Sequence, residues 1–490
     1  MRDLVEGSAR LPPRRRTDRM SASSPQMVDP IAVLAMVAPG GAWLVGGALR
    51  DRLLGRPTSD YDVVVAGPPE PLAQALAREA RAYAFALSEE FGVWRVVSRR
   101  DGWQVDVLPL DGVTIEADLA RRDFTVNAIA EPVHGGELVD PFDGLRDLTG
   151  RRLRMVSPDV FERDPLRTMR LARLASELGF TADPATVAAA ASGAEALASV
   201  APERVFTELR RIVASDRALD GLELMGAVGA TAVVLPELTN LRGVEQSQYH
   251  HLDVYEHTRA VLAEVITLER DPEQALGEQA EPLSRFLAQP LADDLSRSQA
   301  LRFGALMHDI AKPLTRSVTP EGRVTFIGHD QAGAELAMAV LGRLRASERL
   351  SQYVGALARH HLRLGFLVHQ APLDRRTIYR YLNATAPVQA DVIALSVADR
   401  LATRGTGSER AITRHLELAR QLLGQAFAWL ADPPRPPLRG DELARALGIG
   451  PGPEIGRILG QLQEDSFAGE VETPEQAVER ARELLATGGR

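Results

Sequence analysis

Residues 43–62 read Trp-Leu-Val-Gly-Gly-Ala-Leu-Arg-Asp-Arg-Leu-Leu-Gly-Arg-Pro-Thr-Ser-Asp-Tyr-Asp, and this stretch decides the fold. The pattern predicts a strand, a glycine turn, a helix, a loop and a second strand. Residues i and i+2 of a strand face the same side, so Asp60 and Asp62 converge just beyond the Gly46-Gly47 turn. Backbone amides at such a turn suit a triphosphate, and paired carboxylates suit the Mg²⁺ that carries it. The stretch predicts nucleotidyl transfer; the alternative is a tight turn with an Arg50–Asp51 salt bridge.

The composition of the chain points to a cytoplasmic enzyme. It has 490 residues, of which 45% are hydrophobic, enough for about two to four domains with real cores. The absence of cysteine excludes disulfides and thiolate zinc sites. No apolar run approaches the length of a membrane span, and nothing resembles a secretory signal. We therefore expect a cytoplasmic location and no membrane partner.

The charge of the chain is acidic overall but basic in places. With 57 basic and 66 acidic residues the net charge is −9, so a nucleic-acid partner needs local basic patches. Such patches lie at Arg151, Arg152 and Arg154, at Arg163, Arg167, Arg170 and Arg173, and at Arg204, Arg210 and Arg211. We expect Arg151, Arg152 and Arg210 to contact RNA phosphates, with salt-sensitive binding.

Composition and periodicity divide the chain into parts. Residues 1–28 are rich in Arg, Pro and Ser and are predicted to be disordered. Residues 29–155 are predicted to form a small α/β domain, 156–245 an alanine-rich helical region, 246–430 a histidine-bearing helical region, and 438–490 a helical tail. Residues 269–298 are acidic and are expected to be an irregular surface insertion. A proline-rich stretch at 431–437 is predicted to be a stiff linker, and Gly448–Gly452 a joint between two tail helices.

A third carboxylate follows in the first domain. Val93–Val97 and Trp103–Leu108 predict a hairpin around Asp101-Gly102, with Asp106 between two valines of the second strand. A two-metal transfer site needs about three carboxylates. Asp60, Asp62 and Asp106 can supply them.

Residues 118–128, Asp-Leu-Ala-Arg-Arg-Asp-Phe-Thr-Val-Asn-Ala, are the next motif. Arg121 and Arg122 offer cationic forks to phosphates. Asp123 can orient an arginine, and Asn127 can bond a sugar hydroxyl. The acid-rich turn that follows at 140–148 is predicted to be structural.

Residues 161–173, Phe-Glu-Arg-Asp-Pro-Leu-Arg-Thr-Met-Arg-Leu-Ala-Arg, form the fourth motif. Asp164 before Pro165 predicts a helix N-cap. Arg167, Arg170 and Arg173 then lie on adjacent turns of one helix. An aspartate and an arginine here can read the Watson–Crick edge of a base; the alternative is a solvated charged stripe.

In this order the four motifs resemble the class II tRNA nucleotidyltransferase and bacterial poly(A) polymerase family, over roughly residues 40–245. The resemblance implies an α+β fold, with a polymerase-β-type head followed by all-α neck and body domains. It implies Asp60 and Asp62 as ligands of Mg²⁺ and Asp106 as the third carboxylate. Gly47, Arg50 and Arg122 would contact the nucleotide phosphates, Asp164 and Arg167 would select the incoming base, and Arg170 and Arg173 would make further nucleotide contacts.

Two departures from the family pattern concern the product. An acid usually precedes the base-selecting aspartate, and Arg163 stands there instead. The segment between Asp106 and Arg121 is short, where many relatives have a longer basic loop. In this family a shortened loop is a feature of enzymes that add CC but not the final A.

Eight of the ten histidines lie between residues 250 and 369. The adjacent pair His308-Asp309 stands in a strongly apolar helix, where a buried carboxylate needs a partner. Imidazole and carboxylate together suit transition metals or Mg²⁺.

His257, His308, Asp309 and Asp399 resemble the ligand set of the HD phosphohydrolase superfamily. The resemblance implies a divalent metal, Mg, Mn, Ni, Fe or Co, with phosphatase or 2′,3′-cyclic phosphodiesterase chemistry. His329 and the pair His360-His361 resemble the further ligands of two-metal members, with His360 named as the ligand, and Lys312 would contact a phosphate. His250, His251, His369 and His415 are predicted to be structural or surface residues.

The leading hypothesis is a nucleotidyltransferase that adds CMP and AMP from CTP and ATP to the 3′ end of tRNA or other RNA, fused to an HD phosphohydrolase domain. A CC-only enzyme and a poly(A) polymerase are the alternatives within this class. A third hypothesis makes the HD domain the main enzyme and the head a binding module. The sequence leaves the oligomeric state open.

Overall fold

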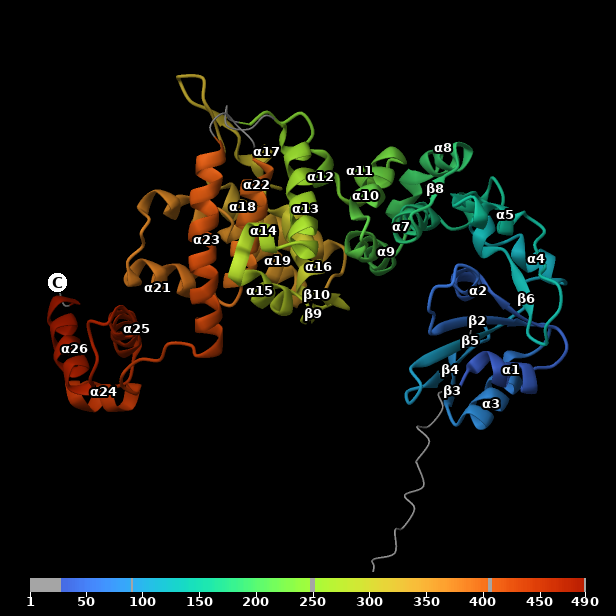
Figure 1. Ribbon diagram of the computed structural model, residues 1–490, viewed down its shortest axis with the longest axis horizontal. Coiled ribbons are helices and arrows are strands. Elements are labelled where there is room, and N and C mark those ends of the chain that lie inside the picture. The colour runs from blue at the N-terminus through green and yellow to red at the C-terminus, as the bar shows by residue number, and fades with distance from the viewer. Residues whose placement is uncertain (1–27, 90, 247–251, 404–407, 489–490) are drawn as a thin grey trace, which may run out of the picture. The chain divides into compact units, whose positions relative to one another are not determined.

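The computed structural model describes residues 28–89, 91–246, 252–403 and 408–488 (Figure 1). The predicted disorder of residues 1–28 lies almost wholly outside this part, as do His250 and His251. Among the described residues, no helix has both the length and the apolar content needed to cross a membrane. The chain divides into two compact units, residues 28–122 with 126–145 and residues 123–125 with 146–488. The predicted head covered residues 29–155, and thirteen of these residues, 123–125 and 146–155, fall in the second unit instead.

The first unit is built on a six-stranded mixed sheet in the order β3-β4-β5-β2-β1-β6 (Figure 1). β2 and β5 run parallel, and the other neighbours run antiparallel. The strands are β1 Ala42–Val45, β2 Asp60–Val65, β3 Tyr83–Ser88, β4 Val93–Ser98, β5 Trp103–Pro109 and β6 Ala130–Pro132. The helices are α1 Pro30–Val37, α2 Gly46–Leu53, α3 Pro69–Ala80 and α4 Ile115–Leu119.

One face of this sheet forms the core. Val63, Val96, Val105 and Val107 are fully buried and pack with apolar residues of α3 such as Leu76. Because side chains alternate along a strand, the residues between these valines point to the opposite face. The predicted hairpin around Asp101-Gly102 is confirmed, since β4 and β5 pair antiparallel.

The second unit is helical, with three small two-stranded sheets. Its first part contains α6 Val160–Arg163, α7 Arg167–Leu178, α8 Pro184–Ser192, α9 Pro202–Ala214, α10 Ala218–Ala227, α11 Ala230–Val234 and α12 Pro236–Thr239, preceded by α5 Gly144–Thr149 at the boundary. The small sheets pair β7 Arg152–Leu153 with β8 Thr181–Ala182, β9 Pro290–Ala292 with β10 Leu295–Ser296, and β11 Ser317–Val318 with β12 Val324–Thr325. Short 3₁₀ turns are η1 Thr125–Asn127, η2 Ala194–Ser199, η3 Gly277–Gln279 and η4 Val368–Gln370.

The histidine-bearing part of this unit contains α13 Val254–Arg270, α14 Glu273–Leu276, α15 Ala280–Leu287, α16 Arg297–Met307, α17 Lys312–Thr315, α18 His329–Arg343, α19 Glu348–His360, α20 Arg363–Leu367, α21 Arg375–Ala384, α22 Gln389–Ala402 and α23 Ser408–Ala431. The expectation of an irregular insertion at 269–298 was wrong. Leu276 and Leu283 are buried from short helices there, because apolar residues recur at helical spacing between the acids. The α+β fold class is confirmed.

The C-terminal tail consists of α24 Gly440–Leu447, α25 Pro453–Ala468 and α26 Pro474–Gly488, with a small core of its own around Leu443, Ile458 and Leu462. Gly448 ends α24 with a φ of +67°, and α25 begins after it, so the predicted joint between two helices is confirmed.

Candidate functional site

The three predicted carboxylates of the head lie together on the face of the sheet opposite the core. The parallel pairing of β2 and β5 sets Asp62 directly beside Asp106, and Asp60 beside Gln104. Asp60 is exposed, and the other two acids are half-buried. Arg95 of β4 grips Asp106 with two hydrogen bonds of 2.7 Å each. Sequence reasoning did not identify Arg95, because its pairing depends on the register of β4 against β5.

The electrostatics of Asp62 fit a cation. Burial raises the pKa of Asp62, and the neighbouring charges of Asp106 and Asp60 raise it further, while Arg122 opposes the shift. Like charges that crowd together in this way are stabilised by a divalent ion. The residues present therefore fit Mg²⁺, with Asp60 and Asp62 as candidate ligands.

The glycine turn requires glycine at its first position. Gly46 has a φ of +69°, and a Cβ there would lie 3.1 Å from both Nη1 of Arg122 and Oδ2 of Asp62. A Cβ on Gly47 would meet only Arg50, at the ordinary contact distance of 3.6 Å. We predicted Gly47 as the glycine that contacts the nucleotide phosphates. In the structure, however, it is Gly46 whose backbone lies close to Asp62 and Arg122.

Acidic and amide side chains hold the arginines of the head in place. Arg50 is buried, and it donates to Asp51 over 3.0 Å and to Oδ1 of Asn127 over 2.7 Å. Arg122 donates to the buried carboxylate of Asp118 over 3.0 Å. Asn127 was predicted to bond a sugar, yet here its oxygen positions Arg50. The two guanidinium groups are thus fixed before any phosphate arrives.

The motif predicted to select the base, in the second unit, begins differently from its prediction. Asp164 was expected to be a helix N-cap, but α7 begins at Arg167 and its N-cap is Leu166. The Asp164 carboxylate accepts from the Leu166 amide over 3.3 Å and lies 3.2 Å from Nη2 of Arg204. The turn at Pro165 delays the helix by two residues. Asp164 and Arg167 still flank one turn, since the Arg167 amide donates to the Asp164 backbone oxygen.

The other arginines of α7 have acidic partners. Asp123 was predicted to orient an arginine. In the structure Nη1 of Arg170 donates to Asp123 over 3.2 Å, in agreement with that prediction. Arg173 is buried and pairs with Glu208 of α9 and with Glu177. It braces α7 against α9, where an incoming nucleotide has little access to it. Its predicted nucleotide contact therefore conflicts with its burial.

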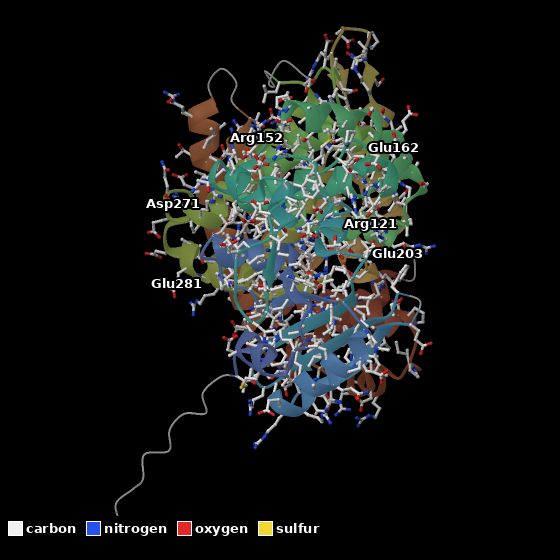
Figure 2. The ribbon with its side chains drawn as sticks, turned by 90° about the vertical axis from the view of Figure 1, so that its right-hand side faces the viewer. Arg121, Arg152, Glu162, Glu203, Asp271 and Glu281 are labelled. Atoms are coloured by element: carbon white, nitrogen blue, oxygen red, sulfur yellow. The ribbon has the colours of Figure 1, made fainter. Side chains whose placement is uncertain are left out.

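The arginines predicted to bind RNA are only partly available. Arg151 is exposed, while Arg152, labelled in Figure 2, pairs with Asp183. Arg210 donates to the backbone oxygen of Asp293 and to Asp294 over 2.7 Å, at the tip of the β9–β10 hairpin. This contact joins segments that are far apart in the sequence, so the residues around Arg210 do not predict it.

The histidine-bearing helices bring a compact metal-type cluster together. His257 comes from α13, His308 and Asp309 follow α16, and Asp399 lies on α22. The Nε2 atom of His257 lies 3.1 Å from Asp399 and 3.6 Å from Asp309. His308 lies 3.1 Å from the same oxygen of Asp309, its Oδ2.

A second group uses the other oxygen of Asp309. Nε2 of His329, at the start of α18, lies 3.3 Å from Oδ1 of Asp309, and Nε2 of His361 lies 3.7 Å from it. The predicted ligand His360 was wrong: it accepts a hydrogen bond from Arg363 outside the cluster. One residue of helix turns a side chain by about 100°, so only one of two adjacent histidines can face inward.

The hydrogen bonds of these imidazoles fit a metal. Nδ1 of His308, His329 and His361 lies 2.8, 2.6 and 2.6 Å from the backbone oxygen three residues earlier. Among the described residues their buried Nε2 atoms make no hydrogen bond. An imidazole that donates from one nitrogen presents the other as a ligand lone pair. Asp309 stands where it can bridge two ions, because each of its oxygens faces one histidine group.

Lys312 also contacts the cluster, and the neighbouring charges shift the pKa values of Asp309 and His361. Burial alone raises the pKa of Asp309, but His308 and Lys312 outweigh it and hold the pKa well below its usual range. Burial and the neighbouring His308 lower the pKa of His361 to about 4, which keeps it neutral. Nζ of Lys312 lies 2.6 Å from Asp309 and 2.7 Å from Oε1 of Gln246, so its predicted phosphate contact requires it to leave these partners. His415, predicted to be structural, is buried beside Ser396.

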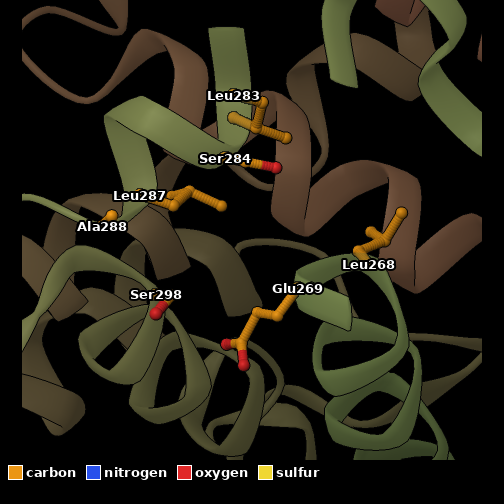
Figure 3. Close-up of a pocket in the computed structure, with 7 residues that line it drawn as sticks. All are labelled: Leu268, Glu269, Leu283, Ser284, Leu287, Ala288 and Ser298. Carbon is orange, nitrogen blue, oxygen red and sulfur yellow. The ribbon is translucent and has the colours of Figure 1, made fainter. Parts of the chain in front are cut away.

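A separate hollow lies between α13, α15 and α16 (Figure 3). Leu268, Leu283 and Leu287 line it, together with Glu269. That carboxylate is held by Arg302. With apolar walls and a neutralised acid, the hollow offers no group for the chemistry above.

Comparison with known proteins agrees with this division of the chain. Residues 42–111 and 98–154 match the family model of the poly(A) polymerase head domain, and residues 254–404 match that of the HD domain. Residues 179–241 match the model described as a probable RNA and SrmB-binding site of polymerase A.

Relatives cover nearly the whole chain. An A-adding tRNA nucleotidyltransferase of Deinococcus radiodurans is 38% identical, over 90% of this chain and 94% of its own length. A CC-adding tRNA nucleotidyltransferase of Thermus thermophilus is 37% identical, over 92% and 95%. The fold is similar to that of a CCA-adding enzyme of Thermotoga maritima complexed with tRNA, with a TM-score of 0.59 and 19% identity over 94% of this chain and 97% of that one. The chain belongs to the tRNA nucleotidyltransferase family.

Proposed function

We propose that the head transfers CMP and AMP from CTP and ATP to the 3′ end of tRNA and thereby builds or repairs the CCA end. The observation that carries this proposal is the carboxylate group Asp60, Asp62 and Asp106 beside the glycine turn at Gly46. Transfer of this kind needs positioning and charge stabilisation more than covalent chemistry. The fixed guanidinium groups of Arg50 and Arg122 supply such charge.

In this proposal Asp60 and Asp62 would hold Mg²⁺, which when bound neutralises the triphosphate and lowers the pKa of the attacking hydroxyl. Asp106, held by Arg95, lies next to Asp62 and would accept the proton of that hydroxyl. Arg50 and Arg122 would bind the phosphates, and the amides near Gly47 would face them. Asp164 and Arg167 would pair with the base, and Arg170 would lie beside them.

A second candidate product is CC without the final A. The link between β5 and α4 consists of residues 110–114 and is tightly turned. A Cβ on Gly112 would lie 2.9 Å from Cβ of Ala117, so the link packs closely onto α4. A link of this kind leaves no long basic loop, which favours a narrower activity. The Thermus relative named as CC-adding is consistent with it.

The test is nucleotide incorporation by the purified chain with Mg²⁺. The substrates are tRNAs that end before CCA, before CA and before A, with CTP and ATP supplied singly and together. CCA followed by a stop supports the main proposal, and a stop after CC supports the second candidate. A long A tail would indicate a poly(A) polymerase instead, and no incorporation would overturn the assignment.

We also propose that the HD cluster binds divalent metal and hydrolyses a phosphoester. His257, His308, Asp309 and Asp399 would hold one ion, and His329 and His361 with Asp309 a second. A metal there supplies an activated water. The orphaned Nε2 atoms support this, and Arg400, whose buried Nε has no hydrogen-bond partner among the described residues, adds positive charge beside Asp399. Hydrolysis of 2′,3′-cyclic AMP after removal and return of Mg, Mn, Ni, Fe or Co tests it; no hydrolysis with any of them counts against it.

A further inference from the structure

The catalytic face of the sheet continues beyond the carboxylates to an aromatic edge. Phe85 of β3 pairs with Arg95 of β4, which pairs with Asp106 of β5, which pairs with Asp62 of β2. Residues directly opposite one another in a sheet point to the same face. Phe85 therefore lies in the same row as the catalytic acids, and Tyr83 lies in the row of Asp60 through Val97 and Gln104.

The aromatic side chains at this edge have no role in the core. Tyr83 is 71% exposed and Phe85 is 46% exposed, although their strand neighbour Ala84 packs against the buried valines. β3 is the edge strand of the sheet. Folding thus gains little from a tyrosine and a phenylalanine here, and large exposed apolar groups next to a site mark a contact surface.

Unpaired cations stand at the Tyr83 end of the same edge. Arg81 lies two residues before Tyr83, and Arg99 lies two residues after Val97, the partner of Tyr83. Both arginines are exposed, and neither makes an ion pair within the described residues. Proteins commonly bind single-stranded nucleic acid by stacking its bases on aromatic side chains and contacting its phosphates with nearby cations.

The spacing suits an RNA strand that ends at the carboxylates. Neighbouring strands lie about 4.8 Å apart, so Phe85 stands about 10 Å from Asp106 and Tyr83 about 14 Å from Asp60. Stacked nucleotides advance about 3.4 Å each. The aromatic pair therefore lies about three or four nucleotides from the reacting end.

We propose that Tyr83 and Phe85 form a platform on which unpaired bases near the RNA 3′ end stack, upstream of the reacting hydroxyl, while Arg81 and Arg99 contact the phosphates of that strand. The proposal rests on the proposed nucleotidyl transfer to RNA. It names RNA as the occupant because the platform is continuous with the carboxylates and carries complementary charge. The N-terminal segment of residues 1–27 and a second copy of the chain, paired along β3, are the competing occupants.

The experiment compares Y83A, F85A and the double variant with Y83F and F85W, which keep the aromatic faces. M36A, at an exposed apolar residue of α1, is the matched control. We expect KM for tRNA that lacks only its terminal A, whose 3′ end is single-stranded, to rise about tenfold for each alanine variant, with KM for ATP unchanged. Y83F, F85W and M36A should behave as wild type. R81A with R99A should flatten the salt dependence of binding, whereas Y83A with F85A should leave its slope unchanged.

A fluorescent base separates this platform from a merely structural effect. With 2-aminopurine three or four positions from the RNA 3′ end, wild-type protein should quench its fluorescence and Y83A/F85A should not. Equal quenching and equal KM in the double variant would overturn the proposal. A change in sedimentation of the RNA-free double variant would assign the edge to a second copy, and tighter RNA binding on deletion of residues 1–27 would assign it to that segment. If wild-type protein incorporated no nucleotide, the proposed function would fail, while the quenching assay would still decide the platform.

Discussion

The Nε2 atom of His361 lies 3.7 Å from Oδ1 of Asp309, whereas the adjacent His360 accepts a hydrogen bond from Arg363 outside the cluster. The two histidines are neighbours in sequence, but His361 is buried and faces the cluster, whereas His360 is half-buried and faces away from it. They offer a matched pair of variants for the metal cluster.

H361A should lower the affinity for the proposed second ion by about 10–100-fold, because it removes the proposed nitrogen ligand. H360A should leave metal content unchanged. Metal analysis of the purified proteins, after dialysis against limiting Mn²⁺, measures the difference. Equal metal loss in both variants would show that the cluster does not bind ions as proposed.

The two sites should be separable. D60A should reduce nucleotide incorporation to background, because it removes a carboxylate from the head, and it should leave hydrolysis of 2′,3′-cyclic AMP unchanged. D309A should do the reverse. Nucleotide incorporation into tRNA and hydrolysis of 2′,3′-cyclic AMP are both measured on each variant. Loss of both activities from a single substitution, in a protein with unchanged thermal unfolding, would contradict independent sites.

The glycine turn makes a prediction about stability as well as activity. G46A forces an L-residue into a left-handed conformation, at a cost of about 1–2 kcal/mol, and brings its Cβ close to Arg122 and Asp62. G47A meets only an ordinary contact with Arg50. We expect a lower melting temperature for G46A than for G47A. Equal melting temperatures would mean that the turn rearranges without strain.

The sequence predicted those features that depend on short spacing. Asp60 and Asp62 share a face because a strand has a period of two, and the Asp101-Gly102 turn fixes the hairpin that carries Asp106. Features that depend on register or long-range packing were missed. Arg95 reaches Asp106 only through the pairing of β4 with β5, and Arg210 meets its hairpin across 83 residues. The rotation of the helix at its end decides that His361 rather than His360 faces inward. Two adjacent histidines in a sequence give no indication of that rotation.

A buried ion pair that includes Glu269, which lines the hollow of Figure 3, should contribute strongly to local stability. Arg302 is 5% exposed, pairs with Glu269, and donates to the backbone oxygens of Val213 and Ser215. R302M leaves Glu269 without its cation, which costs about 3–5 kcal/mol for a pair of this kind. R285M, at an exposed pair with Glu281, should cost less than about 1 kcal/mol. Urea unfolding followed by circular dichroism measures both, and similar midpoints would contradict the argument.

Arg163 stands where the family pattern has an acid, and its contacts indicate how much that matters. Its guanidinium pairs with Asp159, which directly precedes α6, and with the hydroxyl of Ser157. Arg167, by contrast, is half-buried, donates to the backbone oxygen of Val160 over 3.3 Å, and follows Asp164 by a single turn. Because the guanidinium of Arg163 is held by Asp159 and Ser157 just before α6, R163A should leave the ratio of kcat/KM for CTP and ATP unchanged. R167A should lower that ratio by about tenfold or more, since it removes the donor proposed to pair with the base. Incorporation of single nucleotides into tRNA ending before CCA measures the ratio. A larger effect of R163A than of R167A would move base selection from the α7 turn to the exposed side of α6.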